Sequence, residues 1–482
     1  MKKLLCILLA TVMVLGLCAC GGAKEDPNAL QAGFARLDCI PDDPLVHIAG
    51  GDAASDPATD GLLDNLAVTC IALKQGENTY LIYTCDIVDI VDFYKLTESI
   101  ITKETGVPAE NIILNATHTH SAPTLKPSDA KLPGQPNYTS KFNATCKDAA
   151  VAAIADLSAV SGISYGSIMT EKMVRVRHYL MKDGTTYGNG HGSTSSGFQS
   201  HLYDADEECQ VIRIARTAED KKDIVMFNLG AHATTVSGTN TSALSADFPF
   251  PARTYIEDEA GVLAAYFIAA AGDQTPGSKI AGEVANTNHN AQGEALGAYV
   301  VECLNNMTDS ASMDVKLHNE IYVAGRMKDG IEDTDRVAKA NEIMALRSQY
   351  GQSSSQVKDK CKEYGFANYY EASGLVTRSK APETGSFPIA TMLLGDVGLC
   401  FFAGEMFGSQ GRKLKDESPT PMTFVVTCSE DDQGYFPDAL AKEESFYEYD
   451  QTKYEMGTGE AVAERYCEIL TALRDGTEVP AR

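Results

Sequence analysis

The sequence predicts an α/β fold in which mixed β-sheets are flanked by helices, arranged as an αββα-like layered single domain. Apolar, β-branched runs alternate with helical runs along most of the 482 residues, and this mixture is typical of α/β, enzyme-like domains. Hydrophobic residues make up 44% of the chain, so a chain of this length can bury a large core. No internal repeat is visible in this pattern.

Strands are predicted where apolar and β-branched residues run together, and a Gly-Glu-Asn turn at 76–78 indicates that the first two strands form a hairpin. The predicted strands are 66–73, 80–90, 112–116, 210–215, 223–229, 264–270, 320–323, 389–394, 399–403 and 423–426. Helices are predicted where apolar residues recur at helical spacing. The predicted helices are 91–105, 137–157, 291–306 and 334–348.

The first 19 residues have the pattern of a leader. Lys2 and Lys3 precede an apolar stretch at 4–17 that is too short to span a bilayer comfortably. This stretch runs into Leu-Cys-Ala-Cys20, which resembles a bacterial lipobox with cleavage before Cys20 and a lipid on its thiol. We therefore expect a signal peptide at 1–19, a lipidated tether at 20–31 and one folded domain at 32–482, anchored outside the cytoplasmic membrane. An uncleaved anchor is the alternative.

Charge and cysteine usage exclude some classes of function. The formal net charge is −26 and no basic stripe is present, so nucleic acid is not an expected partner. The 13 cysteines contain no Cys-x-x-Cys pair, and many lie in apolar, strand-like runs. Cysteine in such runs behaves as a small hydrophobic residue, so we expect buried thiols rather than a disulfide framework.

The segment 111–124 carries the strongest functional signal. The predicted strand 112–116 runs into His118 and His120, two of only nine histidines. Side chains at i and i+2 of an extended segment point the same way, so both imidazoles are expected on one face. Imidazole is a common Zn²⁺ ligand, and its pKa suits acid–base work near neutrality. Two structural histidines remain the alternative interpretation of this motif by itself.

Four further predicted strands also end at polar, reactive residues, and active sites gather at such positions. The residues that follow these strands are His232 after 223–229, the stretch Asp273-Gln274-Thr275 after 264–270, Glu405 after 399–403 and Tyr435 after 423–426. Each motif alone is more typical of an ordinary loop than of a catalytic site.

Together these motifs resemble the catalytic domain of the neutral/alkaline, non-lysosomal ceramidase family. The resemblance is carried, in chain order, by Asn115-Ala-Thr-His-Thr-His-Ser, Gly230-Ala-His-Ala-Thr, Gly272-Asp-Gln-Thr-Pro, Ala403-Gly-Glu405 and Gly434-Tyr435. Ala32-Gly-Phe-Ala-Arg36 and Arg177-His-Tyr-Leu180 also match family segments. The similarity covers residues 30–475. It implies that 32–482 is a ceramidase-like catalytic domain and that the family's C-terminal β-sandwich is absent.

The resemblance implies one bound Zn²⁺. Its ligands would be His118, His232, Glu405 and Tyr435. Two imidazoles and a carboxylate with room for water match what a catalytic zinc requires. The second histidine of the motif, His120, would be the general acid/base beside the metal.

The resemblance also implies an oxyanion site made by Arg177 and the tyrosine of a Tyr-Glu pair. Two tyrosines fit: Tyr447 keeps the family spacing from Tyr435, while Tyr454 better fits the pattern that follows, and we favour Tyr454. One motif departs from the family, because Thr275 replaces a serine. Threonine keeps the hydroxyl, so a positioning role survives more easily than a nucleophilic one.

The implied function is a cell-surface, zinc-dependent amidohydrolase that cleaves an N-acyl, ceramide-like amide with metal-activated water. Its partners would be a small-molecule or lipid N-acyl substrate and, through Cys20, the membrane. Two alternatives stay open. One is a non-catalytic surface lipoprotein that keeps the fold to bind a ligand, and the other is a zinc-dependent esterase or peptidase acting on a non-lipid substrate.

Overall fold

Two β-sheets form the centre of the computed structural model, which describes residues 26, 28–49, 57–90, 94–125, 132–188, 197–237, 242–277, 288–352 and 354–482. The first sheet has nine strands in the order β12-β11-β10-β5-β1-β2-β3-β4, with β14 beside β5. Their bounds are β1 Gln31–Asp38, β2 Ala67–Gln75, β3 Asn78–Cys85, β4 Ile112–Ile113, β5 Ser158–Met169, β10 Glu208–Arg216, β11 Ile224–Leu229, β12 Leu263–Ile268 and β14 Thr308–Asp309.

The second sheet has four strands in the order β15-β16-β17-β19. Their bounds are β15 Val315–Gly325, β16 Thr384–Leu394, β17 Val397–Phe402 and β19 Met422–Val426. Most pairs in both sheets are antiparallel, but β3–β4, β11–β12 and β17–β19 are parallel. The predicted hairpin is confirmed, since β2 pairs with β3 in antiparallel register around a turn at 76–77.

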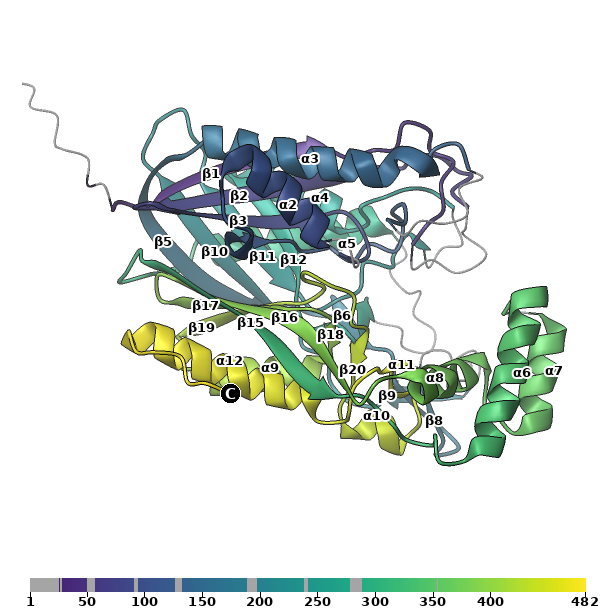
Figure 1. The fold of residues 1–482 in the computed structure, drawn as a ribbon. Helices are drawn as coiled ribbons and strands as arrows, with labels where there is room; N and C mark the ends of the chain where they lie inside the picture. The colour runs from purple at the N-terminus through teal and green to yellow at the C-terminus, as the bar shows by residue number, and fades with distance from the viewer. Residues whose placement is uncertain are drawn as a thin grey trace, which may run out of the picture.

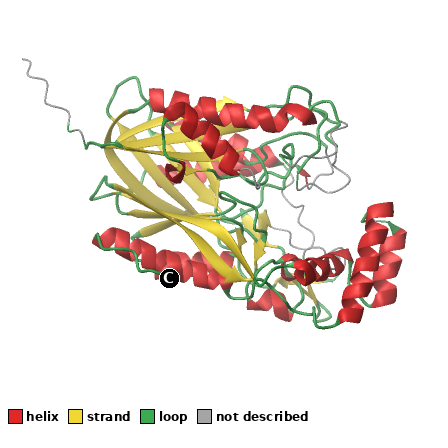
Figure 2. Cartoon of the chain, in the orientation of Figure 1, coloured by secondary structure: helices red, strands yellow, loops and turns green. Residues whose placement is uncertain are grey.

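Helices cover the outer face of each sheet, which gives four layers (Figures 1 and 2). The helices over the first sheet are α2 Tyr94–Thr105, α3 Gln135–Ala155, α4 Pro249–Ala260 and α5 His289–Leu304. Those over the second sheet are α9 Gly408–Glu417 and α12 Thr458–Asp475. The predicted αββα-like α/β fold is therefore confirmed.

Strand periodicity explains how one sheet serves two cores. In β2, Val68, Cys70 and Ala72 pack under the first helix layer, whereas Ile71 and Leu73 face the second sheet. Successive side chains of a strand point to opposite faces, so a strand buried on both sides must be apolar throughout. A third core lies between the second sheet and α12. It contains Cys400, a buried free thiol, as expected for a cysteine in an apolar, strand-like run.

A helical unit projects from one end of the sandwich, beside several short strands (Figure 1). It consists of α6 Thr334–Tyr350, α7 Ser355–Tyr364 and α8 Tyr369–Lys380, and has its own small core. The nearby short elements are β6 Val174–Val176, β7 Tyr179–Met181, β8 Thr186–Tyr187, β9 Phe198–His201, β13 Gln274–Pro276, β18 Glu405–Met406, β20 Tyr435–Phe436, α10 Ala439–Glu443 and α11 Tyr447–Gln451. Elsewhere, a 3₁₀ turn at Ala109–Asn111 directly precedes β4.

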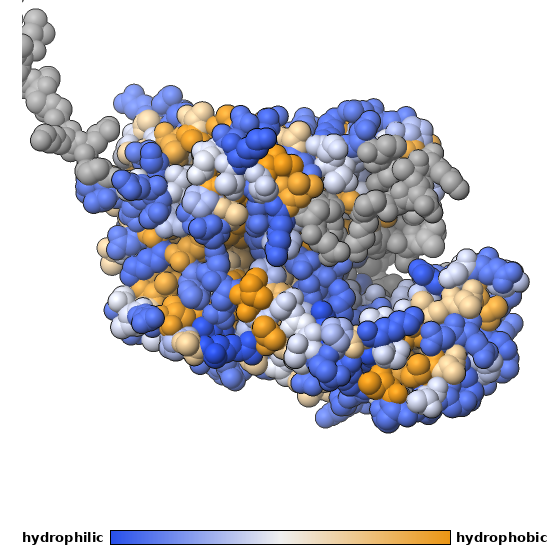
Figure 3. Space-filling model, in the orientation of Figure 1, coloured by the Kyte–Doolittle hydropathy of each residue, from blue (hydrophilic) through white to orange (hydrophobic). Residues whose placement is uncertain are grey.

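Hydrophilic residues dominate the face of the molecule in Figure 3, with apolar side chains scattered among them. Within the described residues, no helix is both long enough and apolar enough to cross a membrane. The predicted leader, with Cys20, lies outside the described residues, as does the start of the predicted helix 91–105.

Candidate metal centre

Chain segments that follow five strands meet at one end of the two sheets. His118 follows β4, His232 follows β11, and Glu405 follows β17. The segment after β12 leads into β13, and the segment after β19 leads into β20. Because β20 pairs with β18, Tyr435 lies opposite Glu405. The structure thus brings the segments predicted at strand ends into one cluster. Their sequence separation is large, so the sheet topology alone brings them together.

The two histidines of the first motif meet through a turn and not through strand alternation. The strand β4 ends at Ile113, and His118 adopts a left-handed backbone with φ 61°. The predicted shared strand face is therefore wrong, although His120 Nε2 still lies 3.2 Å from His118 Nε2. A left-handed conformation is costly for a residue with a Cβ, and such strain concentrates at functional sites.

Backbone carbonyls fix the ring orientation of two histidines. The Nδ1 atom of His118 donates to the carbonyl of Val88 at 2.7 Å, and the Nδ1 atom of His232 donates to the carbonyl of Gln274 at 2.9 Å. Because a carbonyl can only accept, both Nδ1 atoms carry hydrogen and both Nε2 atoms present a lone pair in the neutral rings. A hydrogen bond from the ring nitrogen that does not bind the metal commonly orients metal-binding imidazoles in proteins.

The Nε2 atoms of His118 and His232 both lie near one carboxylate oxygen of Glu405. Glu405 Oε2 lies 3.0 Å from His232 Nε2 and 3.5 Å from His118 Nε2, yet this buried atom makes no hydrogen bond. A buried acceptor without a donor is unfavourable unless a cation completes it. The ring nitrogens of His118, His120 and His232 all lie within 4.8 Å of one another. These residues can therefore hold a metal ion.

The charge states of the cluster residues also favour a bound cation. Burial lowers the pKa of His232 to about 4, and Arg177 adds to this effect, so its ring is neutral at pH 7. Burial alone would raise the pKa of Glu405, but His118 outweighs it and holds that pKa well below the usual range. Burial also lowers the pKa of His118, but Cys428 and Glu405 raise it well above its ordinary value. A proton and a metal ion therefore compete for this nitrogen.

A buried arginine stands beside the cluster. Arg177 Nη1 lies 3.4 Å from His232 Nε2, Arg177 Nη2 donates to the carbonyl of Gly272 at 2.6 Å, and Arg177 Nε donates to Glu448 Oε1 at 2.7 Å. The other Glu448 oxygen lies 3.0 Å from His178 Nε2. Glu448 and His178 were not predicted as individual site residues, although both lie in segments that carry the family resemblance. They aim the guanidinium at the cluster.

The two candidate tyrosines lie in different surroundings. The ring of Tyr447 lies 5.5 Å from the ring of Tyr435, and burial raises the pKa of Tyr447, with Arg177 and Glu405 within electrostatic reach. Tyr454 is buried in the third core, where its hydroxyl donates to Gln433 Oε1 at 2.6 Å. Placement therefore favours Tyr447, and not the preferred Tyr454, as the tyrosine beside the cluster. Pattern matching along the chain could not show which tyrosine faces the cluster.

The remaining predicted site residues lie at the edge of the cluster. Tyr435 stacks near Arg177, whose guanidinium carbon is 5.4 Å from its ring centroid. Thr275 lies on β13 next to the residue whose carbonyl orients His232, and its hydroxyl is 3.2 Å from that of Thr234. This hydroxyl bond ties together β13 and the loop of His232. The placement suits a positioning role for Thr275.

The loop that contains Ser245 and Asp247 braces both histidine segments. The carbonyl of Ser245 accepts from Thr119 Oγ1 at 2.8 Å, between the two motif histidines, and Asp247 accepts from the backbone of Val236 at 2.7 Å. Asp64 holds this loop from behind, through the hydroxyl of Ser245 at 2.5 Å. The loop therefore links the segment of His118 and His120 to the segment of His232.

Comparisons with known proteins show where this architecture recurs. No protein-family model and no curated protein sequence matches the chain. Among solved structures, neutral ceramidase from Pseudomonas aeruginosa is similar with a TM-score of 0.68 and 16% identity, over 95% of this chain and 76% of that one. A ceramidase complexed with C2 is similar with a TM-score of 0.68 and 15% identity, over 94% and 76%. The chain therefore has the fold of the neutral ceramidases.

Proposed function

We propose that the protein is a zinc-dependent amidohydrolase that cleaves an N-acyl, ceramide-like amide bond. The observation that carries the proposal is the convergence of His118, His232 and Glu405, with one buried carboxylate oxygen left without a hydrogen bond. Nitrogen and carboxylate donors of this kind are the ligands that catalytic zinc takes. The shared fold with proteins named ceramidases supports the amide as the bond that is cleaved.

Zinc bound here would polarise the amide carbonyl and acidify water near it. The chain's own residues would do the rest of the work. His120, 3.2 Å from His118, would take a proton from the attacking water and return it to the leaving amine. Arg177, fixed by Glu448 and the carbonyl of Gly272, presents positive charge where the oxyanion develops.

Metal analysis together with substrate turnover tests this function. Purified protein is expected to contain about one zinc per chain and to hydrolyse fluorescent N-acylsphingosine or a simpler N-acyl amine, with loss of activity on chelation and recovery on adding zinc. Binding of the N-acyl compound without turnover would leave a ligand-binding module instead. Turnover of esters or peptides alone would move the assignment to those substrates.

The oxyanion tyrosine has a matched pair of variants. Tyr447→Phe is expected to lower kcat about 10- to 100-fold with little change in Tm, because it removes a donor beside Arg177. Tyr454→Phe removes the bond to Gln433 and should cost about 1 kcal/mol of unfolding free energy while activity stays within about threefold. Steady-state kinetics and thermal melts of both variants check this. The reverse pattern would return the role to Tyr454.

We also propose that the protein is displayed outside the cytoplasmic membrane through a lipid on Cys20. The support is the order of basic residues, apolar run and lipobox at the start of the chain. Fractionation of cells that produce Cys20→Ala tests the anchor: this variant should leave the membrane fraction that holds the wild-type protein.

A further inference from the structure

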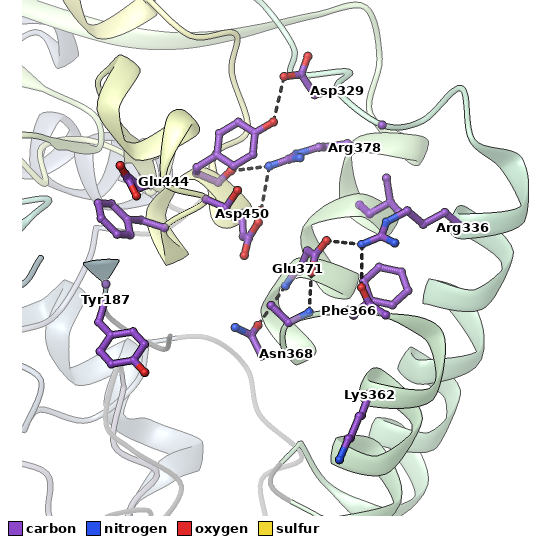
Figure 4. Close-up of a pocket in the computed structure, with 18 of the residues that line it drawn as sticks. Tyr187, Asp329, Arg336, Lys362, Phe366, Asn368, Glu371, Arg378, Glu444 and Asp450 are labelled. Atoms are coloured by element: carbon purple, nitrogen blue, oxygen red, sulfur yellow. Dashed lines mark hydrogen bonds and ion pairs between the residues drawn. The ribbon is translucent and has the colours of Figure 1, made fainter. Parts of the chain in front are cut away.

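A large groove lies between the helical unit and α11. Its volume is about 1020 Å³, at the upper end of the roughly 300–1,000 Å³ that small-molecule sites occupy. One wall is α7 and α8, and the other is formed by β8 and the turns around α10 and α11. Figure 4 shows the two walls, with Tyr187 on one side and Lys362 on the other.

Two of the cations that line the groove make no ion pair within the described residues. Lys358 and Lys362 are exposed, one helical turn apart on α7, and neither ammonium makes an ion pair or hydrogen bond with the described part of the chain. Lys362 carries no dashed line in Figure 4, whereas Arg336 is joined to Glu371. Residues four apart on a helix are neighbours on its surface, so these two charges act on the same volume.

Four carboxylates line the groove, and each of them, Asp450 included, has interactions of its own. Asp329 pairs with Lys442 at 2.7 Å, Glu371 pairs with Arg336, and Glu444 accepts from the hydroxyl of Thr186. None of these contacts joins a carboxylate to Lys358 or Lys362. In a chain with a formal net charge of −26, a concave surface with two uncompensated ammonium groups favours an anionic ligand.

Apolar side chains line the same groove. Phe366, Leu375 and Phe446 contribute to its walls and are largely buried. Charged side chains from both walls line the groove as well. A groove that combines apolar side chains with two exposed ammonium groups that make no ion pair in the described part of the chain fits a molecule with an apolar chain and one anionic end. The two lysines thus select the sign of the charged end, and the apolar residues accept the chain.

The wall of the groove and the metal centre share one helix. Phe446, which precedes α11, stacks on His178 with ring centroids 4.0 Å apart. Glu448 of the same helix holds both His178 and Arg177. Tyr447 contacts Tyr370 at the start of α8, with ring centroids 4.8 Å apart. A ligand in the groove therefore lies against the segment that positions the groups of the candidate active site.

We propose that this groove binds a carboxylate-bearing amphiphile, with its carboxylate at Lys358 and Lys362 and its chain along Phe366, Leu375 and Phe446. A free fatty carboxylate and an N-acyl amino acid share this chemistry. The identification of the ligand as product or substrate rests on the proposed function, since amide hydrolysis releases the first from the second. Binding itself does not depend on hydrolysis.

Equilibrium titration tests the proposal with laurate, N-lauroylglycine and neutral lauramide, each below its aggregation concentration. Both carboxylates are expected to bind, and lauramide at least about tenfold more weakly, because it lacks the charge that the lysines recognise. The Lys358→Gln/Lys362→Gln double variant should lose at least about tenfold in affinity for the carboxylates and change little for lauramide. The tighter of the two carboxylates identifies the source of the ligand.

The matched control is Lys339→Gln/Lys360→Gln, which removes the same charge from α6 and α7. These lysines pair with Asp335 and Glu363 and do not line the groove. The control should bind the carboxylates within about twofold of wild type, and both double variants should keep the wild-type Tm. Equal loss in both double variants, unchanged binding in the groove variant, or equal binding of lauramide would each overturn the proposal. None of these results bears on hydrolysis, which is assayed separately.

Discussion

Replacement of His118 by alanine is expected to remove both the bound zinc and the amidohydrolase activity. His118 supplies one lone pair of the cluster, and its Nε2 lies 3.5 Å from Glu405 and 3.2 Å from His120. Loss of an outer hydrogen-bonding partner already costs about 10- to 100-fold in metal affinity or activity at such sites, so loss of a ligand should cost more, about 10³-fold or greater. Zinc content per chain and kcat/KM measure the two effects.

His318→Ala is the matched control for this variant. His318 lies on β15 and pairs with Glu320 at 3.2 Å, in the second sheet and outside the cluster. It should keep one zinc per chain and wild-type activity. Full activity in His118→Ala, or a retained equivalent of zinc together with activity, would refute the metal centre.

Replacement of Glu448 by glutamine is expected to destabilise the protein by about 3 kcal/mol at pH 7, because it leaves the Arg177 guanidinium buried without its counter-charge. Glu448 has no exposed surface and contacts both Arg177 and His178. Burial would raise the pKa of Glu448, but Arg177 and His178 outweigh it and lower the pKa to about 2 from an ordinary value of 4.5. Activity should also fall, since Arg177 loses the contact that orients it.

The sign of the pH dependence follows from that depressed pKa. The folded state holds the glutamate ionised more strongly than the unfolded state does, so its stabilisation is complete above pH 4.5 and is lost as the pH falls towards 2. Urea denaturation at pH 7, 5 and 3 should show the difference between wild type and Glu448→Gln shrinking at the lowest pH. Glu468→Gln, at an exposed carboxylate whose partner Arg465 keeps its pair with Glu320, should stay within about 0.5 kcal/mol throughout. Equal stability of Glu448→Gln and wild type at pH 7 would contradict this role.

Periodicity and composition predicted the elements whose own residues are mostly apolar and buried. β2, β3, β11, β12 and β17 were predicted because buried strands read as apolar runs. β5 was missed, because it is rich in glycine and serine and only half-buried, so its strand state comes from pairing with β10 along nine register positions. α12 was missed as well, although apolar residues along one face bury it against the second sheet.

The sequence by itself determined which residue types stand at the ends of strands: His118, His120, His232, Glu405 and Tyr435 were predicted from local pattern and family likeness. Only the tertiary structure decided how they meet. The left-handed turn at His118, the choice of Tyr447 over Tyr454 and the hold of Glu448 on Arg177 depend on contacts between segments up to 271 residues apart. Local pattern reports which face of an element is buried, whereas the position of a side chain across two packed sheets depends on how all the elements pack together.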